Sequence, residues 1–196
     1  MEIKEKNVIA AYRSADDNGK NMLKVMFPDF NFENDNRPVT ERIKTFDDVL
    51  REIEDMVDNK GDNTAKRLLA DYNGMESYTP DLEAYIKLRL VVYAINEGWE
   101  PQFTQDEVRW YPWHFLWTAE ELEDKDDDWR RKRALIPVDS YQQEGWAGFS
   151  YALSNCAPSY TFTSFGSRLC CKDEITARHA ATAFIDLWAD FKLIRK

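Results

Sequence analysis

The chain has 196 residues, of which 43% are hydrophobic and 14% aromatic, and its 26 Lys and Arg stand against 36 Asp and Glu, a formal net charge of −10. This length fits one or two domains with a buried core, so the composition excludes disorder for most of the chain. Residues 1–98 carry 14 basic and 20 acidic side chains, and residues 99–196 carry 12 and 16. Because neither half is a basic module, we do not expect non-specific nucleic-acid binding.

No segment of the sequence indicates a membrane or a secreted protein. The longest apolar run, residues 90–95, is far shorter than the ~20 residues that span a bilayer. Residues 1–7 alternate in charge and lack the apolar region of a secretory signal. The cysteines Cys156, Cys170 and Cys171 are odd in number and lack the spacing of a disulfide framework. We therefore predict a cytoplasmic protein with reduced thiols and no membrane partner.

The N-terminal part, residues 1–39, is predicted to be a helical arm followed by a linker. Apolar residues within 8–12 and 22–26 predict short helices, and Pro28 ends the second one. Residues 28–39 contain turn formers without an apolar period. Thr45 and Asp48 then resemble a capping box, which begins a helix with one apolar stripe over residues 46–57.

The clearest predicted element is a helix over residues 80–97. Thr79 can cap it, Pro80 suits its first position, and Gly98 suits a left-handed end. Apolar residues lie on more than one side of this segment. We therefore expect it to be the central helix of the domain.

The second half of the chain predicts strands. In residues 111–117 every second residue is aromatic, which places Tyr111, Trp113, Phe115 and Trp117 on one face. Pro112 restricts this strand to a sheet edge, or to a start after the proline. We expect the aromatic face to pack as the core side against the 80–97 helix. Further predicted strands are 134–138, 148–153, 160–165 and 167–171, and a final helix begins near residue 173.

These elements predict an α+β fold, with N-terminal helices packed on a small, mostly antiparallel C-terminal sheet and a closing C-terminal helix. The expected organisation is the arm and linker of residues 1–39 and a single domain over 40–196. A charged surface insertion is expected at about 118–145.

The charged cluster at 123–133 invites a functional interpretation. A calcium loop is excluded, because Trp129 stands where glycine is required and Leu135 where the bidentate glutamate belongs. The basic run 130–133 follows the acidic run 126–128 at i,i+4 spacing, which favours a solvated, self-paired helix. Thr118 and the residues after it supply a capping box for that helix.

The sequence offers little for catalysis. His114 and His179 are the only histidines and no Cys-x-x-Cys occurs, so we expect no metal and no cofactor. The glycines form no phosphate-binding loop, which excludes nucleotide hydrolysis by a P-loop. Cys156 or Ser167 with a histidine is the remaining nucleophile candidate, and no nucleophile elbow surrounds either.

The strongest chemical signal is the aromatic surplus of seven Trp, nine Tyr and eleven Phe. Exposed rings stack on sugars or bases, or anchor protein interfaces. The candidate binding residues are Trp110, Trp113, Trp129 and Arg168. We expect Trp110 and Trp129 to stay available to a partner. Arg168 alternates with Leu169 in a predicted strand, so its side chain is expected to face away from the core. A surface ion pair is the simpler interpretation of this arginine, and anion binding is the more specific hypothesis.

Four segments carry a resemblance to a known group. They are Ile95–Pro101, Tyr111–Trp113, Gly166–Cys170 and Phe184–Phe191. Over about residues 40–196 the chain resembles uncharacterised phage and prophage proteins of gut Bacteroidales, in which a helix, an aromatic strand, a Gly-Ser-Arg-Leu strand and a terminal helix follow in order. The resemblance implies a mobile-element setting and a bacterial cytoplasm, and it implies no activity.

Three functions are therefore open. The first is an interaction protein without catalytic activity, whose partner is another protein or a self-assembly. The second is a binding module for a sugar or for single-stranded nucleic acid, using Trp110, Trp113 and Arg168. The third is a small hydrolase or transferase. An open aromatic face bordered by arginine would favour the module over the first function, and a nucleophile within reach of a histidine would favour the third.

Overall fold

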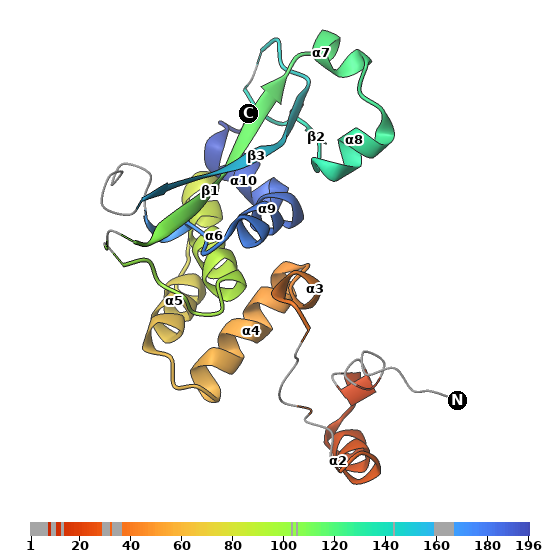
Figure 1. Ribbon diagram of the computed structural model, residues 1–196, viewed down its shortest axis with the longest axis vertical. Helices are drawn as coiled ribbons and strands as arrows, with labels where there is room; N and C mark the ends of the chain where they lie inside the picture. Colours follow the sequence, from red (N-terminus) through yellow and green to blue (C-terminus); the bar gives the residue numbers. More distant parts are fainter. Residues whose placement is uncertain are drawn as a thin grey trace. The chain divides into compact units, whose positions relative to one another are not determined.

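The computed structural model describes residues 8, 11–12, 14–28, 32, 37–102, 104, 106–142, 144–158 and 167–196 (Figure 1). The chain divides into the units Met1–Pro38 and Val39–Lys196, next to the predicted boundary after residue 39. In the first unit, helix α2 (Asp17–Met26) begins at Asp16, whose side chain accepts from the Gly19 backbone N–H. It ends before Phe27, as Pro28 predicts.

The second unit has the predicted α+β class, with an antiparallel sheet and helices closing the C-terminus. Its elements in chain order are α3 (Val39–Arg42), α4 (Phe46–Asp58), α5 (Asn63–Asn73), α6 (Pro80–Ile95), β1 (Val108–Trp117), α7 (Ala119–Glu123), α8 (Asp127–Lys132), β2 (Ile136–Pro137), β3 (Gly148–Pro158), the 3₁₀ helix η2 (Ser167–Leu169), α9 (Glu174–Ala183) and α10 (Ile185–Lys192).

Local signals begin and end these helices where the sequence predicts. Thr45 and Asp48 form the capping box of α4, and Pro80 starts α6. Beyond α6 the backbone turns left-handed at Glu97 (φ 56°) and Gly98 (φ 79°). Buried Asn96 ties this turn to the C-terminal part, because its amide donates to the Cys170 carbonyl (2.9 Å) and its Oδ1 accepts from the Lys172 N–H (3.0 Å).

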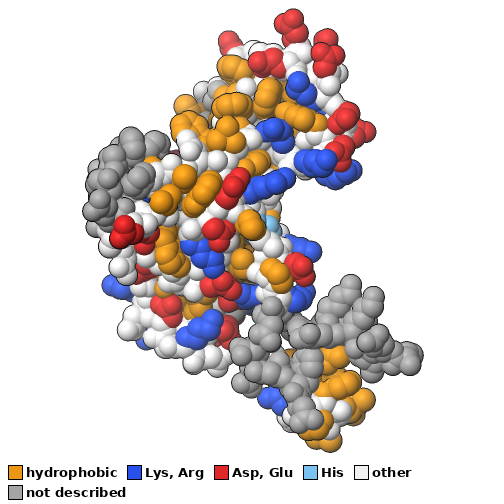
Figure 2. Space-filling view, viewed as in Figure 1, with side chains coloured by type: hydrophobic (Ala, Val, Ile, Leu, Met, Phe, Trp, Pro, Cys, Tyr) orange, Lys and Arg blue, Asp and Glu red, His pale blue; other side chains and the backbone are white. Residues whose placement is uncertain are grey.

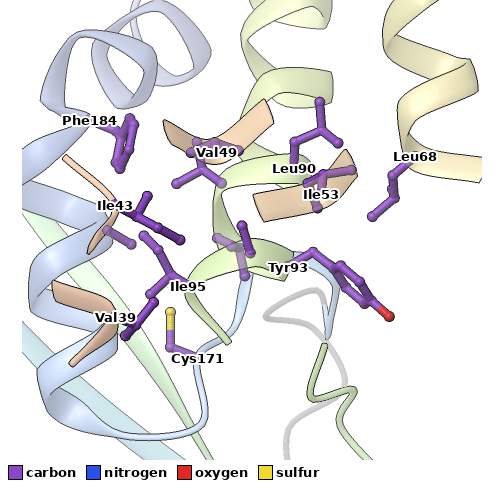
Figure 3. Close-up of a cluster of buried hydrophobic side chains, with 14 of the residues drawn as sticks. Val39, Ile43, Val49, Ile53, Leu68, Leu90, Tyr93, Ile95, Cys171 and Phe184 are labelled. Carbon is purple, nitrogen blue, oxygen red and sulfur yellow. The ribbon is translucent and has the colours of Figure 1, made fainter. Parts of the chain in front are cut away.

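Helix α6 is the central helix, as predicted, since it contacts α4, α5, α9 and α10. Most of its buried residues join the first core cluster (Figure 3), which also holds Val49 and Ile53 of α4, Leu68 of α5 and Phe184. Leu88 of α6 belongs instead to a second cluster with Phe149 and Trp188. Each cluster excludes water from one side of the same helix.

The sheet has the order β1-β3-β2, so β1 is an edge strand, as Pro112 predicts. Trp110 exchanges both backbone hydrogen bonds with Cys171 (2.9 and 2.8 Å), so its N–H and C=O point away from β3. By alternation, the backbone of Pro112 also faces this outer edge, so its missing N–H removes no hydrogen bond between β1 and β3. A register shift lies between Trp113 and His114, with Ala152 as the unmatched residue on β3.

Three predictions for the second half were wrong in detail, and one lies outside the described residues. Residues 167–171 form η2 and a single bridge at Cys171, because only Cys171 lies beside the edge of β1. The insertion holds two helices, since Asp126 caps a new one by accepting from the Trp129 N–H. The final helix breaks at buried Phe184, which is non-helical (φ −123°, ψ 35°) and lets α10 pack against α6. The predicted strand 160–165 is not among the described residues.

Candidate functional site

The outer face of the β1–β3 ribbon exposes large apolar side chains. Trp113 is 43% exposed and Phe115 47%, and Leu153, which lies directly opposite Trp113 on β3, is 47% exposed. Phe115 meets half-buried Trp117 edge-on at 5.8 Å, and the Trp117 Nε1 donates to the Ser150 hydroxyl (2.9 Å). We call Trp113, Phe115, Trp117 and Leu153 the aromatic face. Figure 2 shows hydrophobic side chains gathered over these strands.

This arrangement corrects the prediction that the aromatic face is the core side. The opposite face of β1 carries Trp110, which packs against the first core cluster, and His114 and Leu116, which lie toward the second. The helices that cover this inner face are chiefly α9 and α10 (Figure 1). Trp110 was predicted to stay available to a partner, and the structure instead places it partly buried on the core side.

The inner face holds an unusual polar pair. The His114 ring stacks on Phe149 (5.0 Å, 3°) and lies 5.2 Å from Trp188, and its Nδ1 accepts a hydrogen bond from the Lys192 Nζ (3.0 Å). Burial, and then the Lys192 charge, lower the pKa of His114 to about 3. Burial lowers the pKa of Lys192 to about 8, and its Nζ lies 5.2 Å from the centre of the Trp188 ring. His114 is therefore a neutral acceptor at neutral pH.

Trp129 lies at the end of the aromatic face, and its ring is already in contact with several groups. It meets Trp117 edge-on at 5.2 Å, and the cations of Lys125 and Arg133 lie over it at 5.7 and 5.1 Å. The contact with Trp117 joins the insertion to the sheet, whereas the two cation contacts lie within the insertion. They also occupy the ring surface that a base or a sugar would need.

A groove of about 350 Å³ lies beside the aromatic face. Trp129, Lys132 and Arg133 of the insertion form one side, residues 151–154 of β3 form the floor, and Glu174 and Arg178 of α9 form the other side. We call it the basic groove. Figure 2 shows the surface hollowed between the regions of α8 and α9, with Lys and Arg side chains at its margin.

The charges of the basic groove were missed because the run 130–133 was interpreted as self-paired. Among the described residues, Arg131 and Lys132 are the members of this run that pair with an acid, Asp128. Arg130 instead donates to two backbone carbonyls of the insertion. Arg133 donates to the carbonyls of β3 residues 151 and 152, the latter at 2.5 Å, so its positive charge is not neutralised. Four consecutive basic residues, 130–133, were the available signal in the sequence, whereas Arg178 gave none.

Arg168 lies elsewhere, at a pocket of about 300 Å³ between α5, α6 and η2. It is exposed on η2 and not on a strand, so no strand alternation sets its direction. Trp99 and Arg89 line the same pocket, and Arg89 lies 3.6 Å from the Asp71 carboxylate. The Tyr93 hydroxyl donates to Asp62 (2.8 Å), and burial, followed by this hydrogen bond, raises the pKa of Tyr93. Arg168 and Trp113 thus belong to different surfaces.

Cys156, the nucleophile candidate whose side chain is described, has no hydrogen bond with His114 or His179, which bond to Lys192 and Ile43 respectively. Cys156 is exposed on β3, opposite Trp110. His179 uses its Nε2 to donate to the Ile43 carbonyl (2.6 Å), and burial lowers its pKa. The side chain of Ser167 is not among those described. No cluster of three metal-ligating side chains occurs in the described ranges.

Comparison with family models, with curated proteins and with solved structures gives no match to this chain. Within the described part of the chain, none of the helices has both the length and the apolar composition that a membrane crossing needs. The aromatic face and the basic groove together form the candidate site.

Proposed function

We propose that the protein is an interaction protein without catalytic activity, and that it binds a protein partner on the aromatic face. The observation that carries this proposal is the exposure of Trp113, Phe115 and Leu153 side by side on one sheet face, while α9 and α10 cover the other. Contiguous apolar patches on a soluble surface commonly mark contact sites, and aromatic residues dominate the binding energy of such sites.

The alternative module for sugar or single-stranded nucleic acid has less support. It needs successive open rings accompanied by cations. Of the predicted binding residues, Trp110 is turned to the core, the ring of Trp129 is in contact with two cations, and Arg168 lines a separate pocket. Trp113 alone remains on the open face. The phage or prophage setting and the bacterial cytoplasm rest on the sequence resemblance.

The test is a pull-down with immobilised protein from bacterial host lysate, followed by titration of the recovered protein in purified form. The variants Trp113→Ser and Phe115→Ser remove the aromatic face. Leu82→Ser is the matched control, because Leu82 is 41% exposed on α6. We expect the purified partner to bind wild type and the control equally, and to bind each face variant at least tenfold more weakly, as at an interface hot spot.

Equal binding by all variants would overturn the proposal. Recovery of only nucleic acid or glycan would favour the alternative function, a binding module for single-stranded nucleic acid or sugar. Sedimentation of the purified chain over a range of concentrations shows whether the partner is a second copy. Self-association that Trp113→Ser abolishes would assign the aromatic face to a self-assembly.

A further inference from the structure

The basic groove contrasts in charge with the chain that carries it. The whole sequence has a net charge of −10, whereas the described lining of the groove has three cations, Lys132, Arg133 and Arg178, and one carboxylate, Glu174. Lys132 is paired with Asp128, so the excess positive charge comes from the two arginines. The side chain of Arg178 has no hydrogen bond or ion pair with any described residue, and the Arg133 guanidinium donates hydrogen bonds only to neutral carbonyls. The groove therefore complements an anionic ligand.

The floor of the groove is a strand edge that is only partly used. β2 pairs with β3 at Gly148 and Phe149, and the Tyr151 N–H donates to the Arg133 carbonyl (3.0 Å). Beyond Tyr151, the described residues place no strand on this side of β3. Ser154 lies opposite Pro112, two residues along β1 from Trp110, whose N–H and C=O point away from β3. By this alternation the N–H and C=O of Ser154 point away from β1, toward the free edge of β3.

An extended peptide can use both features at once. Its backbone can bond to a free strand edge, and its alternate side chains then reach the walls of the groove. A nucleic acid has no backbone N–H with which to continue a strand. The adjoining aromatic face favours the same occupant, because Leu153 belongs to that face and also lines the groove.

We propose that the basic groove binds an acidic, extended segment of a protein partner, which adds to β3 beside Ser154 and places a carboxylate against Arg178. This inference rests on the proposed function, since it names the chemistry of the partner that docks on the aromatic face.

The test titrates fluorescent probes into the full chain and follows anisotropy. The first probe is a short peptide that alternates Glu with Leu or Val, and the second replaces every Glu by Gln. The third is the acidic peptide with N-methyl groups on alternate backbone nitrogens, and the fourth is oligothymidylate. We expect the acidic peptide to bind about tenfold more tightly than the Gln peptide, and N-methylation to weaken it to a similar degree.

Two groove variants and one control locate the binding. Arg178→Gln removes a cation without breaking a described contact, and we expect roughly tenfold weaker binding of the acidic peptide. Glu174→Gln removes the one carboxylate among the described residues that line the groove and should tighten binding about threefold. Arg168→Gln makes the same charge change at an exposed arginine in the other pocket and should leave binding unchanged.

Equal binding of the acidic and Gln peptides, or an equal loss in Arg178→Gln and Arg168→Gln, would overturn the charge argument. Insensitivity to N-methylation would overturn strand addition, and preference for oligothymidylate would assign the groove to a nucleic acid. These failures are distinct from failure of the proposed function. That function is judged on the Trp113→Ser and Phe115→Ser variants with a whole partner, whatever the peptides do.

Discussion

His114 should make folding sensitive to mildly acidic pH. Its ring is held between Phe149 and Trp188 and accepts a hydrogen bond from Lys192, and burial lowers its pKa from 6.5 to about 3. Because the folded pKa is lower than the unfolded one, the unfolded chain binds more protons between these two values. Protonation therefore favours unfolding, and stability present above about pH 6.5 is lost as the pH falls toward 3.

The magnitude follows from the two pKa values. Each unit by which the pH lies below the unfolded pKa costs about 1.4 kcal/mol while the folded ring stays neutral, so His114 alone removes about 2 kcal/mol between pH 7 and pH 5. His179 adds a loss of the same sign, since burial lowers its pKa as well. Carboxylates with lowered pKa values, such as Asp48, act mainly below this window.

The assay is urea unfolding of wild type, His114→Phe, His179→Gln and the double variant at both pH values. Phe keeps the aromatic stacking and cannot titrate. We expect His114→Phe to lose about 2 kcal/mol less than wild type between pH 7 and pH 5. The double variant has no histidine, because the chain contains two, and should be nearly insensitive in this window. If wild type and His114→Phe lost equal free energy, His114 would titrate normally in the folded state and the burial argument would be refuted.

Three further variants test the local devices of the fold, each by the free energy of unfolding in urea. Asn96→Leu leaves two backbone groups without their buried partner and should cost roughly 2 to 3 kcal/mol, and a cost below about 0.5 would show that water replaces the amide. Gly98→Ala places a Cβ at φ 79° and should cost about 1 kcal/mol, whereas no loss would contradict the left-handed turn. Thr45→Ala should cost about 1 kcal/mol, and Thr79→Ala, whose side chain makes no capping bond to α6, should cost less.

The sequence predicted those parts of the fold that one residue or one short motif decides. A proline at the first helical position, a glycine after the last, and a threonine with an acid three residues later act through local backbone geometry, so α4 and α6 begin and end close to where Thr45, Pro80 and Gly98 indicate. Pro112 likewise predicted an edge strand, because a missing N–H is harmless only at an edge.

Prediction from the sequence failed where contacts with residues distant in the chain determine which local conformation a segment adopts. Residues 167–171 alternate like a strand, but only Cys171 has a strand edge beside it, at Trp110. The basic groove joins the insertion to Arg178, about 45 residues further along the chain. No spacing in the sequence relates the two segments, because the groove exists only once α9 packs on β3. The spacing of Arg168 and Trp113 in the sequence likewise does not show that they lie on different surfaces.

The orientation of β1 shows why the alternation of aromatic residues was insufficient to predict which face of the strand is buried. Both faces of this strand are apolar, so the period of two does not decide which one is buried. Contacts with α10 determine the inner face, because Trp188 packs beside the His114 ring and Lys192 donates a hydrogen bond to its Nδ1. Trp113 and Phe115 are thereby left half exposed, and burial of one such side chain stabilises a complex by about 1.5 to 3 kcal/mol. Trp113→Ser should therefore weaken partner binding strongly and change the free energy of unfolding little, whereas equal losses in both would show that Trp113 supports the fold.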